Sequence, residues 1–174
     1  IVSKIDIKNV GFDQLNKDNF FEELKEIFFS SSNTKDFKDA NAKENFFYSW
    51  CGQYLEKYPD FFYLAFCKDT LVGYLAGCPD TQSLKGTSLF SDLYQRYPAH
   101  LHINCHENYR GEGIGKLLVE HFKEDLKKKK IIGVHLITAP SARNTNFYRR
   151  MGFEHEVERL LDNNAPLLFM GGQI

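Results

Sequence analysis

Hydrophobic residues along this chain either alternate with polar ones or recur at a helical period, so the pattern predicts a mixture of strands and helices. The alternating segment SKIDIKNV, residues 3–10, predicts a first strand. Residues 18–29 follow the helical period, and Asp18 occupies the position of an N-cap. A second helix is predicted over residues 41–58, because the same period returns there and stops before Pro59. The apolar face of the first helix is made of Phe20, Leu24, Ile27 and Phe28.

The second half of the chain continues with short elements of both kinds. Two aromatic and β-branched runs around Lys68-Asp69-Thr70 predict a hairpin within residues 60–80. Residues 80–98 read as a connecting loop, either irregular throughout or with a short helix in it. Further strands are predicted over residues 99–106, 133–139, 153–161 and 165–172, and further helices over residues 113–129 and 144–151. This order predicts an α/β fold with a mixed, mostly antiparallel sheet of six or seven strands and helices on both faces. Without an internal repeat or linker, residues 1–174 are expected to form a single domain.

Composition narrows the classes of protein that fit. The 174 residues include 22 basic and 23 acidic ones, and this balance gives no reason to expect nucleic-acid binding. Four widely spaced cysteines form no CxxC pair, so we expect buried thiols in a reducing cytoplasm and no metal site. No apolar run approaches the ~20 residues that cross a bilayer, so no membrane partner is expected.

The segment RGEGIGK, residues 110–116, follows a predicted strand and opens a predicted helix. The first N–H groups of a helix lack intrahelical partners, and glycines let them approach an anion closely. Arg110 and Lys116 add positive charge suited to a phosphate. The spacing G-x-G-x-G is neither the dinucleotide fingerprint nor a P-loop. The segment therefore indicates pyrophosphate binding, with a plain structural turn as the alternative.

Two motifs give the chain a resemblance to a known family. Arg110-x-x-Gly113-x-Gly115 is similar to the first signature of the GNAT superfamily, the acetyl-CoA-dependent N-acetyltransferases. FYRRMGF, residues 147–153, resembles the second signature, a tyrosine followed by a Gly-Phe pair. The predicted strand order agrees, so the resemblance covers almost the whole chain. It implies a GNAT-like sheet whose strands splay apart at the cofactor site.

The resemblance also implies how acetyl-CoA would be held. The pantetheine arm would lie along the central strand like a peptide added to a sheet edge. The residues implied in cofactor binding are Ile103 and Cys105 through their backbone, Gly111, Gly113, Ile114, Gly115 and Lys116 through their amides, and Arg110 at the turn.

Tyr148 falls on the tyrosine that resembles the family's general acid, which would protonate the departing thiolate. Its alternative is a packing role. Many relatives carry an asparagine seven residues before this tyrosine, where Ser141 stands here. Asn144 could contact the cofactor instead, or could act only as a helix cap.

Histidines mark one side of the predicted strand 99–106. His100, His102 and His106 alternate with apolar residues, and an imidazole can take the proton of an amine acceptor. The stretch AHLH also resembles the start of the same strand in arylalkylamine N-acetyltransferases, where a His-x-His pair serves the amine. A bulge could turn either side chain away, so the base is His100 or His102, with a buried structural pair as the alternative. His106 fits a structural role, and His135 on the adjacent strand could also face the cleft.

The leading hypothesis is an enzyme that transfers acetyl from acetyl-CoA to a primary amine of a small molecule or peptide, by direct attack in a ternary complex. Cys105 is not expected to act as a covalent nucleophile. The second hypothesis is a non-catalytic acyl-CoA-binding or protein-interaction module, because the chain also resembles the acetyltransferase-like domains joined to O-GlcNAc hydrolases. A homodimer is possible, since dimers are common among relatives. Aromatic residues available to an acceptor cleft are Phe46, Phe47, Tyr48, Trp50, Tyr54, Tyr94 and Tyr97.

Overall fold

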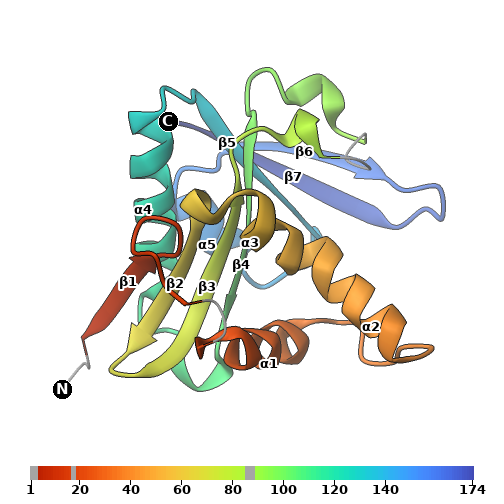
Figure 1. The fold of residues 1–174 in the computed structure, drawn as a ribbon. Helices are drawn as coiled ribbons and strands as arrows, with labels where there is room; N and C mark the ends of the chain where they lie inside the picture. Colours follow the sequence, from red (N-terminus) through yellow and green to blue (C-terminus); the bar gives the residue numbers. More distant parts are fainter. Residues whose placement is uncertain (1–3, 17–18, 85–88) are drawn as a thin grey trace. The chain divides into compact units, whose positions relative to one another are not determined.

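The structure, a computed structural model, describes residues 4–16, 19–84 and 89–174, and its elements are labelled in Figure 1. Asp18, the expected N-cap, and residues 85–88 of the expected loop lie outside the described residues. The strands are β1 (Ile5–Asn9), β2 (Phe62–Cys67), β3 (Thr70–Cys78), β4 (Ala99–Cys105), β5 (Gly133–Thr138), β6 (His155–Leu160) and β7 (Pro166–Gln173). The α-helices are α1 (Phe21–Ser31), α2 (Ala40–Phe47), α3 (Gln53–Lys57), α4 (Ile114–Lys128) and α5 (Thr145–Arg150).

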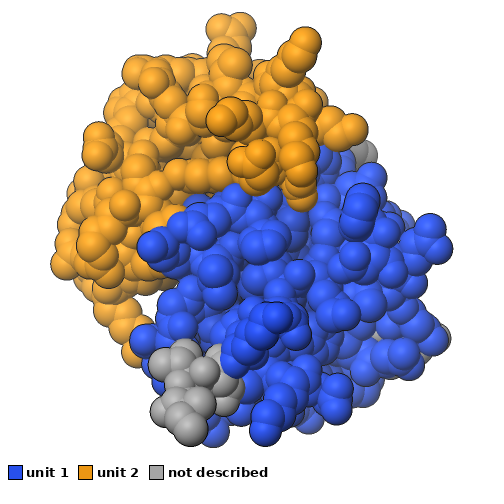
Figure 2. Space-filling model, turned by 90° about the vertical axis from the view of Figure 1, so that its left-hand side faces the viewer, with its two compact units in different colours: residues 1–77, 102–122 blue, residues 78–101, 123–174 orange. Residues whose placement is uncertain are grey.

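The seven strands follow one another in the sheet in the order β1-β2-β3-β4-β5-β7-β6. β4 and β5 pair in parallel, through Ala99↔Val134 and His100↔His135, whereas the pairs β1–β2, β2–β3, β5–β7 and β6–β7 are antiparallel. The predicted fold class, a mixed and mostly antiparallel sheet with helices, is confirmed. The chain groups into two compact units, residues 1–77 with 102–122 and residues 78–101 with 123–174, which are coloured separately in Figure 2. A single domain over residues 1–174 stays a prediction.

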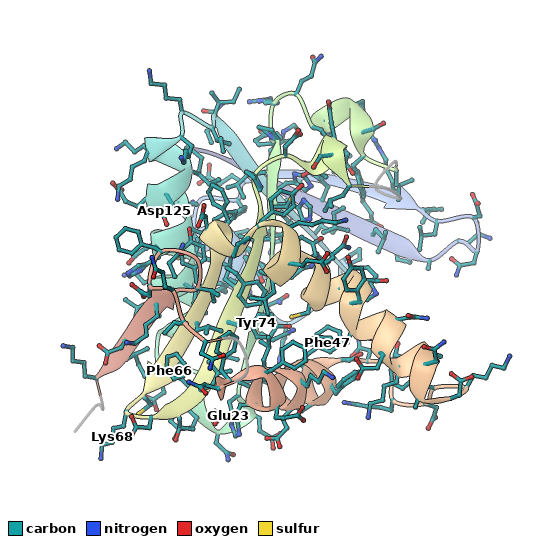
Figure 3. The ribbon with its side chains drawn as sticks, viewed as in Figure 1. Glu23, Phe47, Phe66, Lys68, Tyr74 and Asp125 are labelled. Atoms are coloured by element: carbon teal, nitrogen blue, oxygen red, sulfur yellow. The ribbon has the colours of Figure 1, made fainter. Side chains whose placement is uncertain are left out.

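The first unit packs helices against both faces of its strands. Successive residues of β2 point to opposite sides, as strand geometry requires. Phe62 stacks on Tyr74 of β3 at 5.8 Å, and Tyr63 packs on Phe122 of α4 at 5.9 Å between ring centroids. The α1 helix is joined to the tip of the hairpin by Glu23, labelled in Figure 3, whose carboxylate accepts a hydrogen bond from the N–H of Leu71. This bond lies beside a register shift in β2–β3 at Ala65/Phe66, where the ladder is irregular.

The second predicted helix is not one regular helix. It begins as α2, passes through a π-helical turn η2 (Tyr48–Gly52) and resumes as α3. A π turn adds a residue to the helical repeat and so changes the faces on which the following side chains lie. Periodicity alone did not predict the turn, because apolar residues occur on several sides of this segment. Phe47, labelled in Figure 3, and Tyr54 are buried, whereas Tyr48 and Trp50 are 42% and 50% exposed.

The second unit is built around β5, β7 and β6 with an aromatic cluster formed by Phe90, Tyr94, Tyr97 and Phe169. Tyr97 requires a glycine beneath its ring. A Cβ at Gly171 would lie 2.9 Å from three of the ring carbons, a distance that real side chains do not reach. The guanidinium of Arg159 on β6 holds the segment between β3 and β4 by hydrogen bonds to the carbonyl of Leu89 and to the carboxylate of Asp92.

The helices in the described part of the chain are too short or too polar for any of them to span a membrane.

Candidate functional site

The glycine-rich turn has a backbone conformation that few residues other than glycine adopt. Gly111 and Gly113 adopt φ angles of +84° and +79°, in the left-handed region that favours glycine. No atom lies within 4 Å of a Cβ built on either residue, so the space beside this backbone is open. A turn of this kind points successive N–H groups into one concavity, which is a recognised anion-binding arrangement.

The start of α4 supplies further donors to the same turn. The N–H of Leu117 donates to the carbonyl of Gly113 over 3.2 Å, which closes the first turn of the helix. The N–H groups of Ile114, Gly115 and Lys116 precede that bond, so helix geometry provides no carbonyl for them. The side chains of Arg110 and Lys116 are both exposed, and the ammonium of Lys116 lies 3.9 Å from Glu120 in a weak surface pair. The turn therefore joins backbone donors, a helix dipole and two cations.

The end of β4 presents alternate backbone groups to its two sides. The N–H of His106 donates to the carbonyl of Val72 on β3, and the carbonyl of Asn104 lies beside Gly73 of the same strand. Because consecutive residues of a strand point their backbone groups in opposite directions, Ile103 and Cys105 direct theirs away from β3. This is the orientation that a ligand lying along the strand would need.

Side chains on β4 alternate in the same way. Cys105 points toward β3 and α4, where its sulfur lies 3.3 Å from a Cβ built on Gly73, and burial raises the pKa of its thiol to about 11 even though Arg110 opposes the shift. A thiol with that pKa stays protonated near neutral pH, which agrees with the expectation that Cys105 is not a nucleophile. Asn104, on the other side, donates from Nδ2 to the hydroxyl of Tyr74 over 2.7 Å. Tyr74 is fully buried, and burial raises the pKa of its phenol well above the ordinary value.

His102 lies in an aromatic surrounding within the first unit. Its Nε2 is 3.0 Å from the hydroxyl of Tyr54, and its ring makes edge-to-face contacts with Tyr54 and Trp50 at 5.2 and 5.7 Å. Burial lowers the pKa of His102 to about 4, so the imidazole is neutral near pH 7. His102 is thus a weaker base than an ordinary histidine, whose pKa is near 6.5, because these aromatic neighbours do not solvate an imidazolium.

His100 lies in a polar surrounding within the second unit. Its Nδ1 is 2.7 Å from the hydroxyl of Thr81, and that hydroxyl also donates to the carbonyl of Pro98 over 2.7 Å. His100 is 6% exposed, and its ring centroid lies 5.5 Å from that of His135.

His135 and His106 have structural contacts. His135 is buried, its Nδ1 donates to the carbonyl of Tyr97, and its ring stacks on Tyr94 and Phe169. The possibility that His135 faces the cleft is therefore replaced by a core position. His106 lies at the start of a 3-10 turn and accepts a hydrogen bond from the N–H of Asn108, as a structural role predicts.

Tyr148 is held firmly on α5. It is 5% exposed, and its ring makes edge contacts with Phe147 and Phe153 at 5.1 and 5.8 Å. The helix ends at Arg150, Gly152 just beyond it has a φ of +94°, and the N–H of Phe153 donates back to the carbonyl of Tyr148. Lys123 of α4 caps this end by donating to the carbonyl of Met151.

Asn144 occupies the N-cap position of α5, but its side chain makes no capping hydrogen bond there. The alternative that the Asn144 side chain caps the helix is therefore wrong. Its φ is −89° and its ψ is 1°, whereas a capping side chain reaches the helix N–H groups from an extended backbone. The side chain is exposed, so its predicted contact with a cofactor stays a prediction.

Each unit thus carries some of the site residues that were predicted from the sequence. The first unit holds the glycine turn, the end of β4 and His102, and the second holds His100, Tyr148 and Asn144. Sequence reasoning missed Thr81 as the partner of His100, since one threonine in a polar loop carries no signal. It named Tyr54 only as a wall residue. Within the described residues, no group of three or more His, Cys, Asp or Glu side chains is arranged to hold a metal ion.

A mixed sheet whose strand β4 leads through a glycine-rich turn into α4 is the arrangement that the resemblance to acetyltransferases predicted. Residues 17–153 match the acetyltransferase (GNAT) family. The chain therefore belongs to the acetyltransferase (GNAT) family, as the two motifs predicted, and it is an acyltransferase by family. A search of the curated proteins gives no match.

Solved structures share the fold at low sequence identity. The ribosomal-protein-alanine N-acetyltransferase from Brucella melitensis is 19% identical with a TM-score of 0.66, over 97% of this chain and 99% of that one. The PaiA N-acetyltransferase from Thermoplasma acidophilum, in complex with coenzyme A, is 16% identical with a TM-score of 0.60, over 98% and 99%. A chain of the NatC complex bound to Gag peptide and CoA is 16% identical with a TM-score of 0.68, over 98% and 99%.

Proposed function

We propose that this protein transfers the acetyl group of acetyl-CoA to a primary amine of a small molecule or peptide, by direct attack of the amine in a ternary complex. The observation that carries the proposal is the turn at residues 110–116, where Gly111 and Gly113 have positive φ and open space beside them. Similar structures were solved with coenzyme A or with CoA and a peptide, which supports this cosubstrate and an amine acceptor.

In this proposal the turn binds the pyrophosphate of the cosubstrate. The N–H groups of the turn and of the first residues of α4 donate to the phosphate oxygens, and the Arg110 guanidinium adds a charge-assisted bond. The amides of pantetheine pair with the backbone of Ile103 and Cys105, which points away from β3. The residues that donate from the backbone are Gly111, Gly113, Ile114, Gly115 and Lys116.

The acetyl thioester supplies the carbonyl carbon that the amine attacks, and the chain provides a proton donor and a proton acceptor. As the carbon–sulfur bond breaks, the phenol of Tyr148 gives its proton to the sulfur. A thiol has a pKa near 8.5 and a tyrosine near 10, so this transfer is close to balanced and hydrogen bonding can assist it. The proton that leaves the amine nitrogen goes to an imidazole on β4, His100 or His102. Solvent then returns a proton to the phenolate.

Two measurements test the proposal. Calorimetry with acetyl-CoA measures cofactor binding, and a thiol-release assay with a panel of amines, peptides and aminosugars measures turnover. We expect binding together with release of the thiol for at least one amine, with sequential kinetics and no burst. Binding without turnover on any acceptor would favour the non-catalytic binding module instead. If acetyl-CoA did not bind at all, both the acetyltransferase and the acyl-CoA-binding module would be ruled out.

Tyr148→Phe tests the acid role separately. Because phenylalanine keeps the ring packed between Phe147 and Phe153, we expect kcat to fall about 100-fold with little change in the affinity for acetyl-CoA. Phe147→Leu, which alters the same aromatic contacts but removes no hydroxyl, is the matched control. If Tyr148→Phe turned over at the rate of the unaltered protein, Tyr148 would not be the acid.

A further inference from the structure

The ammonium of Lys123 on α4 lies over the turn that follows α5. Its Nζ donates to the carbonyl of Met151, lies 4.6 Å from the centroid of the Phe153 ring, and is 3.4 Å from a Cβ built on Gly152. A carbonyl at the C-terminal end of a helix attracts a cation, and so does the face of an aromatic ring. One side chain thus contacts three successive residues of the chain, 151–153.

The turn that Lys123 contacts also fixes the backbone of Tyr148. The carbonyl of Tyr148 accepts hydrogen bonds from the N–H of Met151 over 3.1 Å and from the N–H of Phe153 over 3.0 Å. The ring of Tyr148 meets the ring of Phe153 edge to face, with 5.8 Å between their centroids. The two residues that bond the Tyr148 carbonyl are therefore contacted by the Lys123 ammonium as well, Met151 through its carbonyl and Phe153 through its ring.

The same turn packs against strand β7. The carbonyl oxygen of Gly152 lies 2.8 Å from a Cβ built on Gly172, a distance that leaves no room for a side chain at position 172. Phe153, the next residue, is fully buried. The turn is thus held both by β7 and by Lys123.

The Lys123 ammonium has no ion-pair partner among the described residues. The side chain is half-buried, and burial lowers the pKa of its ammonium, so the charge costs free energy of folding near neutral pH. An uncharged side chain of similar length would fill the same space without this cost. The presence of a cation here is therefore explained by what it holds in place and not by the stability of the whole fold.

We propose that Lys123 is a positioning residue for the transfer reaction: by holding Met151 and Phe153 it keeps Tyr148 where its phenol can protonate the departing thiolate. This inference rests on the proposed acetyl transfer and on the acid role of Tyr148. All four residues belong to the second unit. Without the ammonium the turn loosens, and a small displacement of a reacting group is enough to slow a transfer step.

The hold on the turn can be measured without any turnover. Lys123→Met keeps the length of the side chain but removes the ammonium. Hydrogen exchange followed by NMR should show the N–H groups of Met151 and Phe153 exchanging at least ~10-fold faster in this variant. The urea midpoint should be no lower than that of the unaltered protein, because the cost of the buried charge is gone.

Two results of these measurements would overturn the proposal. Unchanged exchange at Met151 and Phe153 would show that the ammonium does not hold the turn. A lower urea midpoint, with faster exchange throughout the molecule, would show that Lys123 supports the whole fold instead of this turn.

Steady-state kinetics test the link to catalysis. Lys123→Met should lower kcat about 10-fold and leave the KM for acetyl-CoA unchanged. Lys123→Arg keeps a cation and N–H donors, so its kcat should stay within about 3-fold of the unaltered protein. Lys127→Met removes an exposed lysine four residues further along α4 and is the matched control, which should keep full activity. A raised KM for acetyl-CoA with unchanged kcat in Lys123→Met would contradict a positioning role.

A double-variant comparison tests whether Lys123 acts through Tyr148. In a Tyr148→Phe background, Lys123→Met should add no further loss of kcat, because the hydroxyl that it positions is gone. An undiminished second loss would show that Lys123 acts through another group. If the protein acetylates no amine, the proposed function fails, whereas the exchange measurement still decides whether the ammonium holds the turn.

Discussion

The depressed pKa of His102 makes a prediction about stability that needs no substrate. In the folded protein burial lowers the pKa of this imidazole from 6.5 to about 4. In the unfolded chain the ring is solvated and regains its ordinary pKa. Between these two values the unfolded chain binds a proton that the folded protein does not, so the free energy of unfolding falls as the pH falls through this window. Above pH 6.5 the His102 imidazole is neutral in both the folded and the unfolded state, so it no longer lowers the free energy of unfolding.

The two pKa values give the size of the effect. They differ by about 2.5, and each pKa unit corresponds to about 1.4 kcal/mol, so this residue lowers the free energy of unfolding by about 3 kcal/mol between neutral pH and pH 4. The residue as a whole is only partly buried, and screening by solvent reduces the figure toward about 2 kcal/mol. Even the smaller value is a large share of the 5–15 kcal/mol that folded domains typically have.

Urea unfolding at several pH values measures this effect, and the fluorescence of Trp50, the only tryptophan of the chain, reports the transition. His102→Gln keeps a polar group near Tyr54 but cannot take up a proton, so its free energy of unfolding should depend less on pH by up to about 1.4 kcal/mol per pH unit between pH 6.5 and 4. His121→Gln changes an exposed histidine of α4 and serves as the control. Equal pH dependence in the unaltered protein and in His102→Gln would show that His102 is not desolvated, and the argument against it as a base would fail.

Three further predictions concern single residues. Gly113→Asp places a carboxylate and a Cβ in the open space of the turn, so calorimetry should detect no binding of acetyl-CoA, while Gly113→Ala should bind about 10-fold more weakly; full affinity in the Asp variant would place the anion elsewhere. Cys105→Ala should retain thiol release, because its sulfur faces Gly73, and loss of all turnover with intact cofactor binding would make the thiol a reactant. Gly171→Ala should lower the free energy of unfolding by about 1–3 kcal/mol through contact with Tyr97, and an unchanged urea midpoint would contradict that packing.

Most of the fold could be predicted from the sequence because the period of apolar residues changes at each element. The alternation in residues 99–106 and the helical spacing that follows are unambiguous, and β4 and α4 lie within one residue of the predicted bounds. The hairpin was equally clear, and Lys68, in the turn between β2 and β3, has the positive φ that a tight turn requires. The π turn at Tyr48–Gly52 could not be predicted, since aromatic residues on several sides of the helix leave its period undefined.

Part of the candidate site could likewise be predicted from the sequence, and part could not. The glycine turn is predictable because positive φ and missing side chains are properties of the residue type itself. The roles of the histidines are not, because they depend on partners far away in the sequence. Tyr54 is 48 residues from His102, and Thr81 is 19 residues from His100. Neither partner belongs to a motif, so only the folded chain shows them.

The two histidines of β4 show why a His-x-His pattern does not by itself identify a base. They are one strand repeat apart on the same side of an alternating segment, and sequence reasoning treats them as equivalent. Folding surrounds His102 with the rings of Trp50 and Tyr54, which penalise an imidazolium, and places the hydroxyl of Thr81 2.7 Å from Nδ1 of His100. The chemistry of each ring is set by what its other nitrogen contacts. The contacts of each ring in the folded chain, and not the pattern, therefore distinguish the two candidate bases.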